Sequence, residues 1–363
     1  MIGPWVIQPS PGALAAAGWY EGDRPWMRAA LSGAEADPFS CTPFWQLPLH
    51  EAIAPGWPLL VREDGDSALN FAISRSLFSP GLYLLPLDHQ WRFASPLLGP
   101  EGIDLLEDTV RAGEYPVRAA PGDCIEISGV RVPARVAHVE ISGVRAQSRA
   151  AEGLARRFGP RARFRLRSRQ TLCGASLEGG LDGFLSRRSA NFRKKLRQQA
   201  RRAEREAISF ERVCPADIEE AETVYGRMLE VEGRSWKGQV GDGLLARFPR
   251  DFYGRLLSRL SLARAGRVIF ARGLGRDIGF IFGGVTGGIY RGQQFSFDAD
   301  WAAFSIGHLM QFEQVRWLCE AGAIRYDMGP RYRRGMAYKA HWTELQFPME
   351  TWSLDWEDGS FGC

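Results

Sequence analysis

The sequence predicts an α+β protein in which mixed α/β sheets are divided between two domains. First, 363 residues are too many for one typical domain. Second, three strand-like segments follow one another in the second half, between helical segments, as in an antiparallel meander. Third, the first half combines short helices with hairpins and lacks the regular alternation of a doubly wound parallel sheet. We place the domains at residues 1–173 and 174–363.

Short elements are expected in the first domain. The acidic segment EDGD joins two strand candidates, and its Asp64-Gly65 pair has the chemistry of a hairpin turn. The segment DPFSCTPFWQLPLHEAI suggests a turn that leads into a helix, which Pro55 ends. We expect strands at residues 58–62, 67–73, 81–87 and 161–166, and helices at residues 26–31, 102–112 and 146–158.

The second domain begins after the glycine-rich segment GASLEGGLDG, residues 174–183. Its first helix lies within the basic segment, residues 186–205, because Phe192, Leu196 and Ala203 fall on one face of a helix. Further helices are expected at residues 215–232, 249–263 and 305–321, and strands at residues 267–271, 278–285, 289–297, 324–328 and 345–354.

The stretch IYRGQQFSFDADWAAFSIGHLM, residues 289–310, couples a strand to a helix start and is where we expect a ligand. Ser305 lies where a helix N-cap belongs. The backbone N–H groups of residues 305–308 are then expected to be free, and together with the helix dipole they would attract a phosphate or pyrophosphate. The alternative is an ordinary capped connection with a glycine for close packing.

Charge is concentrated in the basic segment. It contains nine Lys and Arg residues and one Glu, a net charge of +8, whereas the whole chain carries +4. The remainder is therefore acidic, and a general nucleic-acid coat is not indicated.

The cysteines and histidines exclude the common local metal motifs. The six cysteines are never closer than 41 residues, so there is no CxxC pair, and the five histidines form no HExxH motif. We expect reduced thiols and no metal. No apolar run is long enough to span a membrane, which favours a soluble cytoplasmic protein.

Four ordered motifs point to a family: SRRSANFRKKLRQQARR, LEVEGRSWKGQVGDG, FDADWAAFSIGHLM and YDMGPRYRRGMAYKAHW. Together they cover roughly residues 175–345 and resemble the BioF2-like branch of the Gcn5-related N-acetyltransferase (GNAT) superfamily, which is close to CelD-like and FemAB-like proteins. The first half is similar to the N-terminal unit of that family through DPFSCTPFWQLPL. The resemblance implies tandem GNAT-like folds, of which the first is degenerate or binds substrate.

The resemblance also implies a donor site. In this superfamily acyl-CoA lies in a gap opened by a bulge in the fourth strand, with its pyrophosphate on the amides of the next helix. Gln293, Gln294 and Phe295 then correspond to the bulged strand. The phosphate turn corresponds to Ser305, Ile306, Gly307 and His308. FSIGHL keeps one of the usual glycines of this turn, and FemAB-like members use aminoacyl-tRNA instead of acyl-CoA.

The resemblance further implies catalysis by direct attack of an amine, or less often a hydroxyl, on a thioester or ester carbonyl. Candidate proton acceptors are Asp298, His308 and Glu313. Tyr338 is expected to protonate the leaving thiolate. The alternatives are a turn cap for Asp298, a surface position for His308 and core packing for Tyr338.

The expected substrate-binding residues lie in loops and on the basic helix: Trp236, Lys237, Arg193, Arg197, Lys339 and Trp342. Lys339 would hold an acidic group or a phosphate. The alternatives are a half-buried loop tryptophan for Trp236, core packing for Trp342 and a solvated face for the basic helix.

Three functions remain open at this stage. The first is an acyl-CoA-dependent N-acyltransferase that acts on an amine of a small metabolite, sugar or peptide. The second is an aminoacyl-tRNA-dependent transferase of FemAB type, for which tRNA is a partner. The third is a non-catalytic binding module. The acceptor, the acyl chain and the oligomeric state are not encoded in any motif.

Overall fold

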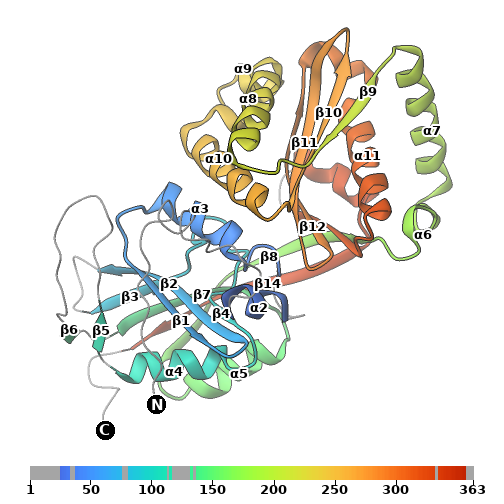
Figure 1. Ribbon diagram of the computed structural model, residues 1–363. Coiled ribbons are helices and arrows are strands. Elements are labelled where there is room, and N and C mark those ends of the chain that lie inside the picture. Colours follow the sequence, from blue (N-terminus) through green and yellow to red (C-terminus); the bar gives the residue numbers. More distant parts are fainter. Residues whose placement is uncertain are drawn as a thin grey trace. The chain divides into compact units, whose positions relative to one another are not determined.

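The computed structural model describes residues 25–32, 37–75, 81–112, 114–116, 131–133, 136–331 and 334–356. The chain divides into two compact units (Figure 1). The first comprises Met1–Gln170 and Pro348–Cys363, and the second Thr171–Phe347. The sequence-based division placed all residues after 173 in the second domain. In the structure, residues 348–363 belong to the first unit.

The first unit is built on a mixed sheet in the order β1-β2-β3-β7-β14. Its pairs are antiparallel except for β3 and β7, which are parallel. A short β4 also pairs with β2, and β5 and β6 form a separate ribbon. The strands are β1 (Leu59–Asp64), β2 (Ser67–Arg75), β3 (Leu82–Leu85), β4 (Leu97–Leu98), β5 (Glu114–Pro116), β6 (Arg131–Pro133), β7 (Val136–Arg145) and β14 (Leu345–Asp355); the helices are α2 (Pro25–Ser32), α3 (Pro43–Ile53), α4 (Gly102–Ala112) and α5 (Arg149–Phe158).

Local sequence explains several elements of this unit. The predicted hairpin connects β1 to β2, with Asp64 opposite Ser67 and Gly65 in the left-handed conformation at φ +52°. Ser148 begins α5 in the usual way, because its side chain accepts a hydrogen bond from the Ala151 amide. Apolar side chains of α4 and α5, including Leu106 and Phe158, pack with Ile141 of β7 in one buried cluster.

The second unit has a sheet in the order β8-β13-β12-β11-β10-β9. The three predicted meander strands are confirmed as β10, β11 and β12, which pair antiparallel; only β12 and β13 are parallel. The strands are β8 (Arg163–Ser176), β9 (Ser209–Val213), β10 (Gly266–Gly273), β11 (Arg276–Thr286), β12 (Ile289–Phe297) and β13 (Arg325–Pro330). Residues 163–170 of β8 belong to the first unit, and residues 345–347 of β14 belong to the second.

Helices cover both faces of this sheet, α8 and α10 on one and α7 and α11 on the other (Figure 1). The α-helices are α6 (Gly180–Ser186), α7 (Ala190–Arg205), α8 (Ile218–Arg234), α9 (Trp236–Gln239), α10 (Arg247–Leu262) and α11 (Ile306–Glu320); the 3-10 helices are η1 (Gly243–Leu245), η2 (Ala299–Phe304) and η3 (Arg334–His341). The predicted apolar face of α7 is confirmed, because Leu196 and Ala203 are buried. The expected loop at residues 233–243 is instead the end of α8 followed by α9.

Candidate functional site

Strand β12 changes partners along its length. It pairs with β13 only through Ile289, Tyr290 and Arg291. Beyond this point it continues against β11, but the register shifts: Gly292 lies opposite Gly283 and Gln294 opposite Phe282. Gln293 is therefore the extra residue of a β-bulge. The geometry places the bulge where β12 leaves β13, within the residues expected to hold the donor.

The side chains of the bulge point to different partners. Gln294 Nε2 donates a hydrogen bond of 2.8 Å to the Tyr253 hydroxyl of α10. Gln293 Nε2 is buried and has no hydrogen-bond partner. An unsatisfied buried donor costs about 1–3 kcal/mol, so Gln293 is a donor group that a ligand could satisfy.

The start of α11 follows β12 after the short helix η2. Ser305 stands at the N-cap position, but it is left-handed at φ +58° and its side chain makes no capping hydrogen bond. Its amide donates to the Ala302 carbonyl, and the His308 amide donates to the Ser305 carbonyl at 3.0 Å. The expectation of four free amides is therefore wrong. Of the four amides at residues 305–308, those of Ile306 and Gly307 have no hydrogen-bond partner among the described residues.

Gly307 brings this helix start close to the bulged strand. A Cβ atom at residue 307 would lie 3.1 Å from Phe295 Cε2 and 3.4 Å from Phe297 Cε1. A glycine at this position therefore favours close packing, as the alternative interpretation of this stretch stated. The same contact sets the two unpaired amides next to β12, so packing and anion binding do not exclude each other.

The segment after α8 is fastened to β12 by Lys237. Lys237 Nζ donates a 2.9 Å hydrogen bond to the Phe295 carbonyl and lies 3.7 Å from Glu232 Oε1, a carboxylate with no exposed surface. Burial lowers the pKa of Lys237, and the charge of Glu232 opposes this shift. Trp236 beside it is 60% exposed. Of this predicted pair, Trp236 is thus accessible to a substrate, whereas the Lys237 ammonium is engaged with backbone.

Helix η3 lies against the same part of β12. The ring of Tyr338 meets Phe295 edge-on, at 5.7 Å between centroids, and burial raises the Tyr338 pKa above its usual value. Its hydroxyl forms no hydrogen bond with the described residues. Lys339 Nζ donates 2.7 Å hydrogen bonds to the carbonyls of Met328 and Pro330 in β13, and burial lowers its pKa to about 8. Lys339 therefore binds backbone carbonyls of β13, and its ammonium is not at the surface, where it was expected to bind an acidic group of the substrate.

His308 and Trp342 form a stacked pair at the start of α11, with centroids 5.9 Å apart. Trp342 is 1% exposed and also packs against Phe184 and Phe192. The core alternative therefore describes Trp342 better than substrate contact. His308 is half-buried, and its pKa is lowered first by burial and then by the charges of Lys195 and His341. A neutral imidazole results, which is the form that can accept a proton.

The carboxylates proposed as bases are engaged elsewhere. Asp298 is 2% exposed, and its Oδ2 lies 3.0 Å from Arg234 Nε and 3.1 Å from Arg276 Nη2. Its Oδ1 accepts from the Asp300 amide, so the cap alternative describes it. Glu313 is paired with Arg212 and Arg316. Sequence reasoning did not identify Arg234 as the partner of Asp298, and these residues are 64 positions apart.

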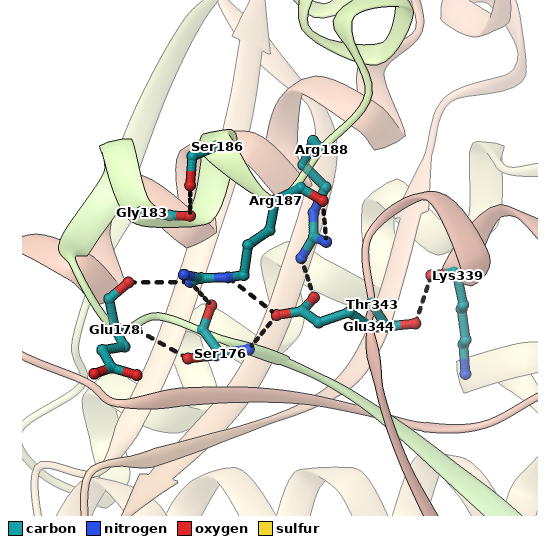
Figure 2. Close-up of polar contacts among 9 residues, drawn as sticks. All are labelled: Ser176, Glu178, Gly183, Ser186, Arg187, Arg188, Lys339, Thr343 and Glu344. Carbon is teal, nitrogen blue, oxygen red and sulfur yellow. Dashed lines mark hydrogen bonds and ion pairs between the residues drawn. The ribbon is translucent and has the colours of Figure 1, made fainter.

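The arginines of the basic segment differ in role. Arg187 donates to the carbonyls of Ser176 and Glu178, and both Arg187 and Arg188 pair with Glu344 (Figure 2). Arg193 Nη1 donates to the carbonyls of Leu185 and Arg188 at 3.1 Å, so it fixes the turn between α6 and α7.

Further along α7, Arg197 has an exposed side chain, with no ion pair to the described residues. Of the two predicted arginines, Arg197 is exposed and Arg193 is half-buried.

Among the described residues, no group of three or more His, Cys, Asp and Glu side chains is arranged to hold a metal ion. Within the same residues, no helix is both long and apolar enough to cross a bilayer.

Residues 190–340 match a family model described as an acetyltransferase (GNAT) domain. No curated protein matches the sequence. The crystal structure of FemX is similar at a TM-score of 0.61 and 11% identity, over 90% of this chain and 94% of FemX. A conserved protein of unknown function from Bacteroides thetaiotaomicron VPI-5482 is similar at 0.56 and 10% identity, over 98% and 100% of the two chains.

A tandem GNAT protein from the clavulanic acid biosynthesis pathway aligns over 97% of this chain and 98% of its own, at 12% identity, but its TM-score of 0.42 is too low to support an argument. At these identities a structural likeness shows the fold alone. The predicted fold class is confirmed. Residues 190–340, which contain β12 and α11, match the model of the GNAT acetyltransferase domain, and over most of its length the chain shares the fold of FemX.

Proposed function

We propose that this chain is an acyltransferase that takes an acyl group from acyl-CoA and transfers it to an amine of a small metabolite, sugar or peptide. The observation that carries the proposal is the bulge at Gln293, at the point where β12 leaves β13 and beside the two unpaired amides of α11. Backbone groups released from strand pairing would bond the amide-rich arm of the donor, and the helix amides would receive its pyrophosphate.

Two of the predicted catalytic side chains retain suitable chemistry. His308 is neutral because burial and neighbouring positive charges lower its pKa, so it can accept the proton that the attacking amine loses. Tyr338 keeps its proton because burial raises its pKa, so its hydroxyl can protonate the thiolate as the carbon–sulfur bond breaks. Asp298 is left out of the reaction, since two arginines hold its carboxylate.

The remaining predicted contacts divide between scaffold and substrate. Lys237, Lys339 and Arg193 donate hydrogen bonds to backbone carbonyls, so we assign them a structural role. Trp236 and Arg197 are exposed and remain candidates to contact the acceptor. We assign the chain to the BioF2-like and FemAB-like branch on the four sequence motifs, with the first unit in a substrate-binding role.

Ligand-dependent thermal stability tests the donor. A ligand at about 100 times its Kd stabilises the folded chain by ~2.7 kcal/mol, which raises the melting temperature measurably. Acetyl-CoA and longer acyl-CoAs are expected to give such a shift, and desulfo-CoA serves as the matched control for nucleotide binding without a thiol. The absence of any shift with CoA compounds, combined with salt-sensitive binding of tRNA, would favour the aminoacyl-tRNA donor. A chain that binds CoA but transfers no acyl group to any amine would be a binding module.

A further inference from the structure

The segment 235–245 is assembled around the buried carboxylate of Glu232. The carboxylate accepts hydrogen bonds from the Leu244 amide at 2.9 Å and the Ser235 hydroxyl at 3.3 Å. Gly243, at φ +69°, could not be any other residue without movement, because a Cβ atom there would lie 2.0 Å from Glu232 Oε1. A charge in the interior is tolerated only when it is paired and hydrogen-bonded. Glu232 therefore fixes the whole segment in one arrangement.

The pairing charge belongs to Lys237. Its ammonium lies 3.7 Å from Glu232 and donates a hydrogen bond to the carbonyl of Phe295, 58 positions away in the sequence. Phe295 belongs to the part of β12 that has no β13 partner, two residues after the bulge. The lysine thus bonds backbone in the stretch of β12 where the neighbouring strand is missing.

We propose that Lys237 is a positioning residue for the acyl donor, one that sets the geometry of the bulged strand instead of touching the substrate. This inference rests on the proposed function for its effect on the donor, but its structural part does not. Glu232 holds the ammonium in place, and the ammonium holds the Phe295 carbonyl. Phe295 in turn packs under Gly307 and against Tyr338, so its position determines the helix start and the candidate acid together.

The variant Lys237→Met keeps the length of the side chain and removes both charge and donor. We expect acyl-CoA to bind about tenfold more weakly, as measured by isothermal titration calorimetry. The variant loses the hydrogen bond from the charged Lys237 side chain that holds the bulged strand in its binding geometry. The matched control is Arg227→Gln. This variant removes the hydrogen bonds by which Arg227 of α8 binds Glu211 and Asp277 of the sheet. It is expected to lower the melting temperature without changing donor affinity.

Chemical rescue separates positioning from general loss of stability. In Lys237→Cys the new thiolate can displace bromide from 2-bromoethylamine, which forms a thioether that ends in an ammonium at the place of the lysine. Donor affinity should return after this treatment, while wild-type protein treated in parallel should not change. This pair also provides the comparison if the methionine variant is too unstable to titrate. Failure of the modified protein to recover affinity would count against the proposal.

Hydrogen exchange tests the structural part without any ligand. The amides of residues 292–297 should exchange faster in Lys237→Met than in the wild type, and those of residues 289–291, which β13 pairs, should change little. If wild-type protein binds no acyl-CoA, the proposed function fails and the exchange result alone decides the role of Lys237. Unchanged exchange in residues 292–297 together with unchanged donor affinity overturns the inference.

Discussion

Two short segments support the separated strands of the second unit, and each does so through one lysine. Segment 235–245 holds β12 by the bond from Lys237 to the Phe295 carbonyl. Helix η3 holds β13 by the bonds from Lys339 to the carbonyls of Met328 and Pro330. The two lysines differ in their electrostatic surroundings: Lys237 has the carboxylate of Glu232 nearby, whereas no acidic side chain among the described residues pairs with Lys339.

This difference indicates which region is adjustable. Burial lowers the pKa of both lysines, but the charge of Glu232 opposes this shift at Lys237. An ammonium held only by carbonyls loses its proton more easily, and the pKa of Lys339 is about 8. We therefore expect the β12 side of the site to be rigid and the β13 side to respond to pH.

The largest effect should come from the β12 side. Gly307→Glu is expected to abolish acyl-CoA binding, because the side chain would displace Phe295 and its carboxylate would lie beside the two unpaired amides. Gly307→Ala is the control, since it introduces the contact without the charge. Titration calorimetry should show a modest loss for alanine and no measurable binding for glutamate. Equal losses would mean that residue 307 serves packing alone.

The next effect concerns pH and the β13 side. The pKa of Lys339 is about 8 in the folded chain, below its ordinary value of 10.5. Between these pH values the unfolded chain binds the proton that the folded chain has lost, so the free energy of unfolding rises with pH. The folded wild type should gain up to about 3 kcal/mol relative to Lys339→Met between pH 8 and 10.5.

Urea unfolding of both proteins at several pH values measures this gain. The exposed Lys195→Met is a matched control for the loss of one lysine. A constant difference between wild type and Lys339→Met over this range would show that the Lys339 ammonium is not strained by burial.

The sequence predicted the fold where a pattern was strong. The meander β10-β11-β12 has apolar and aromatic residues with short turns, and α7 has an apolar stripe at helical spacing. Strand β7 was not predicted, although most of it is buried, because Gly143 and charged or polar residues interrupt VAHVEISGVR. The extension of β8 over residues 167–176 was missed, and the small residues at its end, CGAS, resemble a connection.

The sequence predicted the bulged strand, but it did not show which partners the surrounding side chains bind. The bulge falls on the predicted strand residues Gln293 and Gln294 because the motif order located β12. Ser305 was expected to cap a helix, and only the structure reveals that it is left-handed and that its side chain makes no capping hydrogen bond. The lysines looked available for substrates, since bonds to carbonyls 9 to 58 positions away leave no mark in a single sequence.

Tyr338 connects the two regions, since its ring contacts Phe295 of β12 and its neighbour Lys339 is bonded to β13. Tyr338→Phe is expected to lower kcat about 100-fold if the hydroxyl protonates the thiolate, and to leave donor affinity unchanged. Release of thiol from acyl-CoA in the presence of amine acceptors measures the rate. The hydroxyl makes no hydrogen bond with the described residues, so stability should change by less than about 0.5 kcal/mol. Unchanged turnover would return Tyr338 to packing.

The smallest effects are expected on the basic helix. There Arg193 bonds backbone carbonyls, whereas Arg197 faces solvent. Arg193→Ala removes two bonds to the carbonyls of Leu185 and Arg188 and should lower the free energy of unfolding by about 1 kcal/mol. Arg197→Ala removes an exposed group and should change it by less than about 0.5 kcal/mol. If an anionic acceptor uses this helix, Arg197→Ala should instead weaken its binding, with a shallower salt dependence than the wild type. Denaturant titrations of the two variants in one buffer distinguish these roles. An equal loss of stability in both variants would contradict the assignment of a structural role to Arg193 and a solvent-facing role to Arg197.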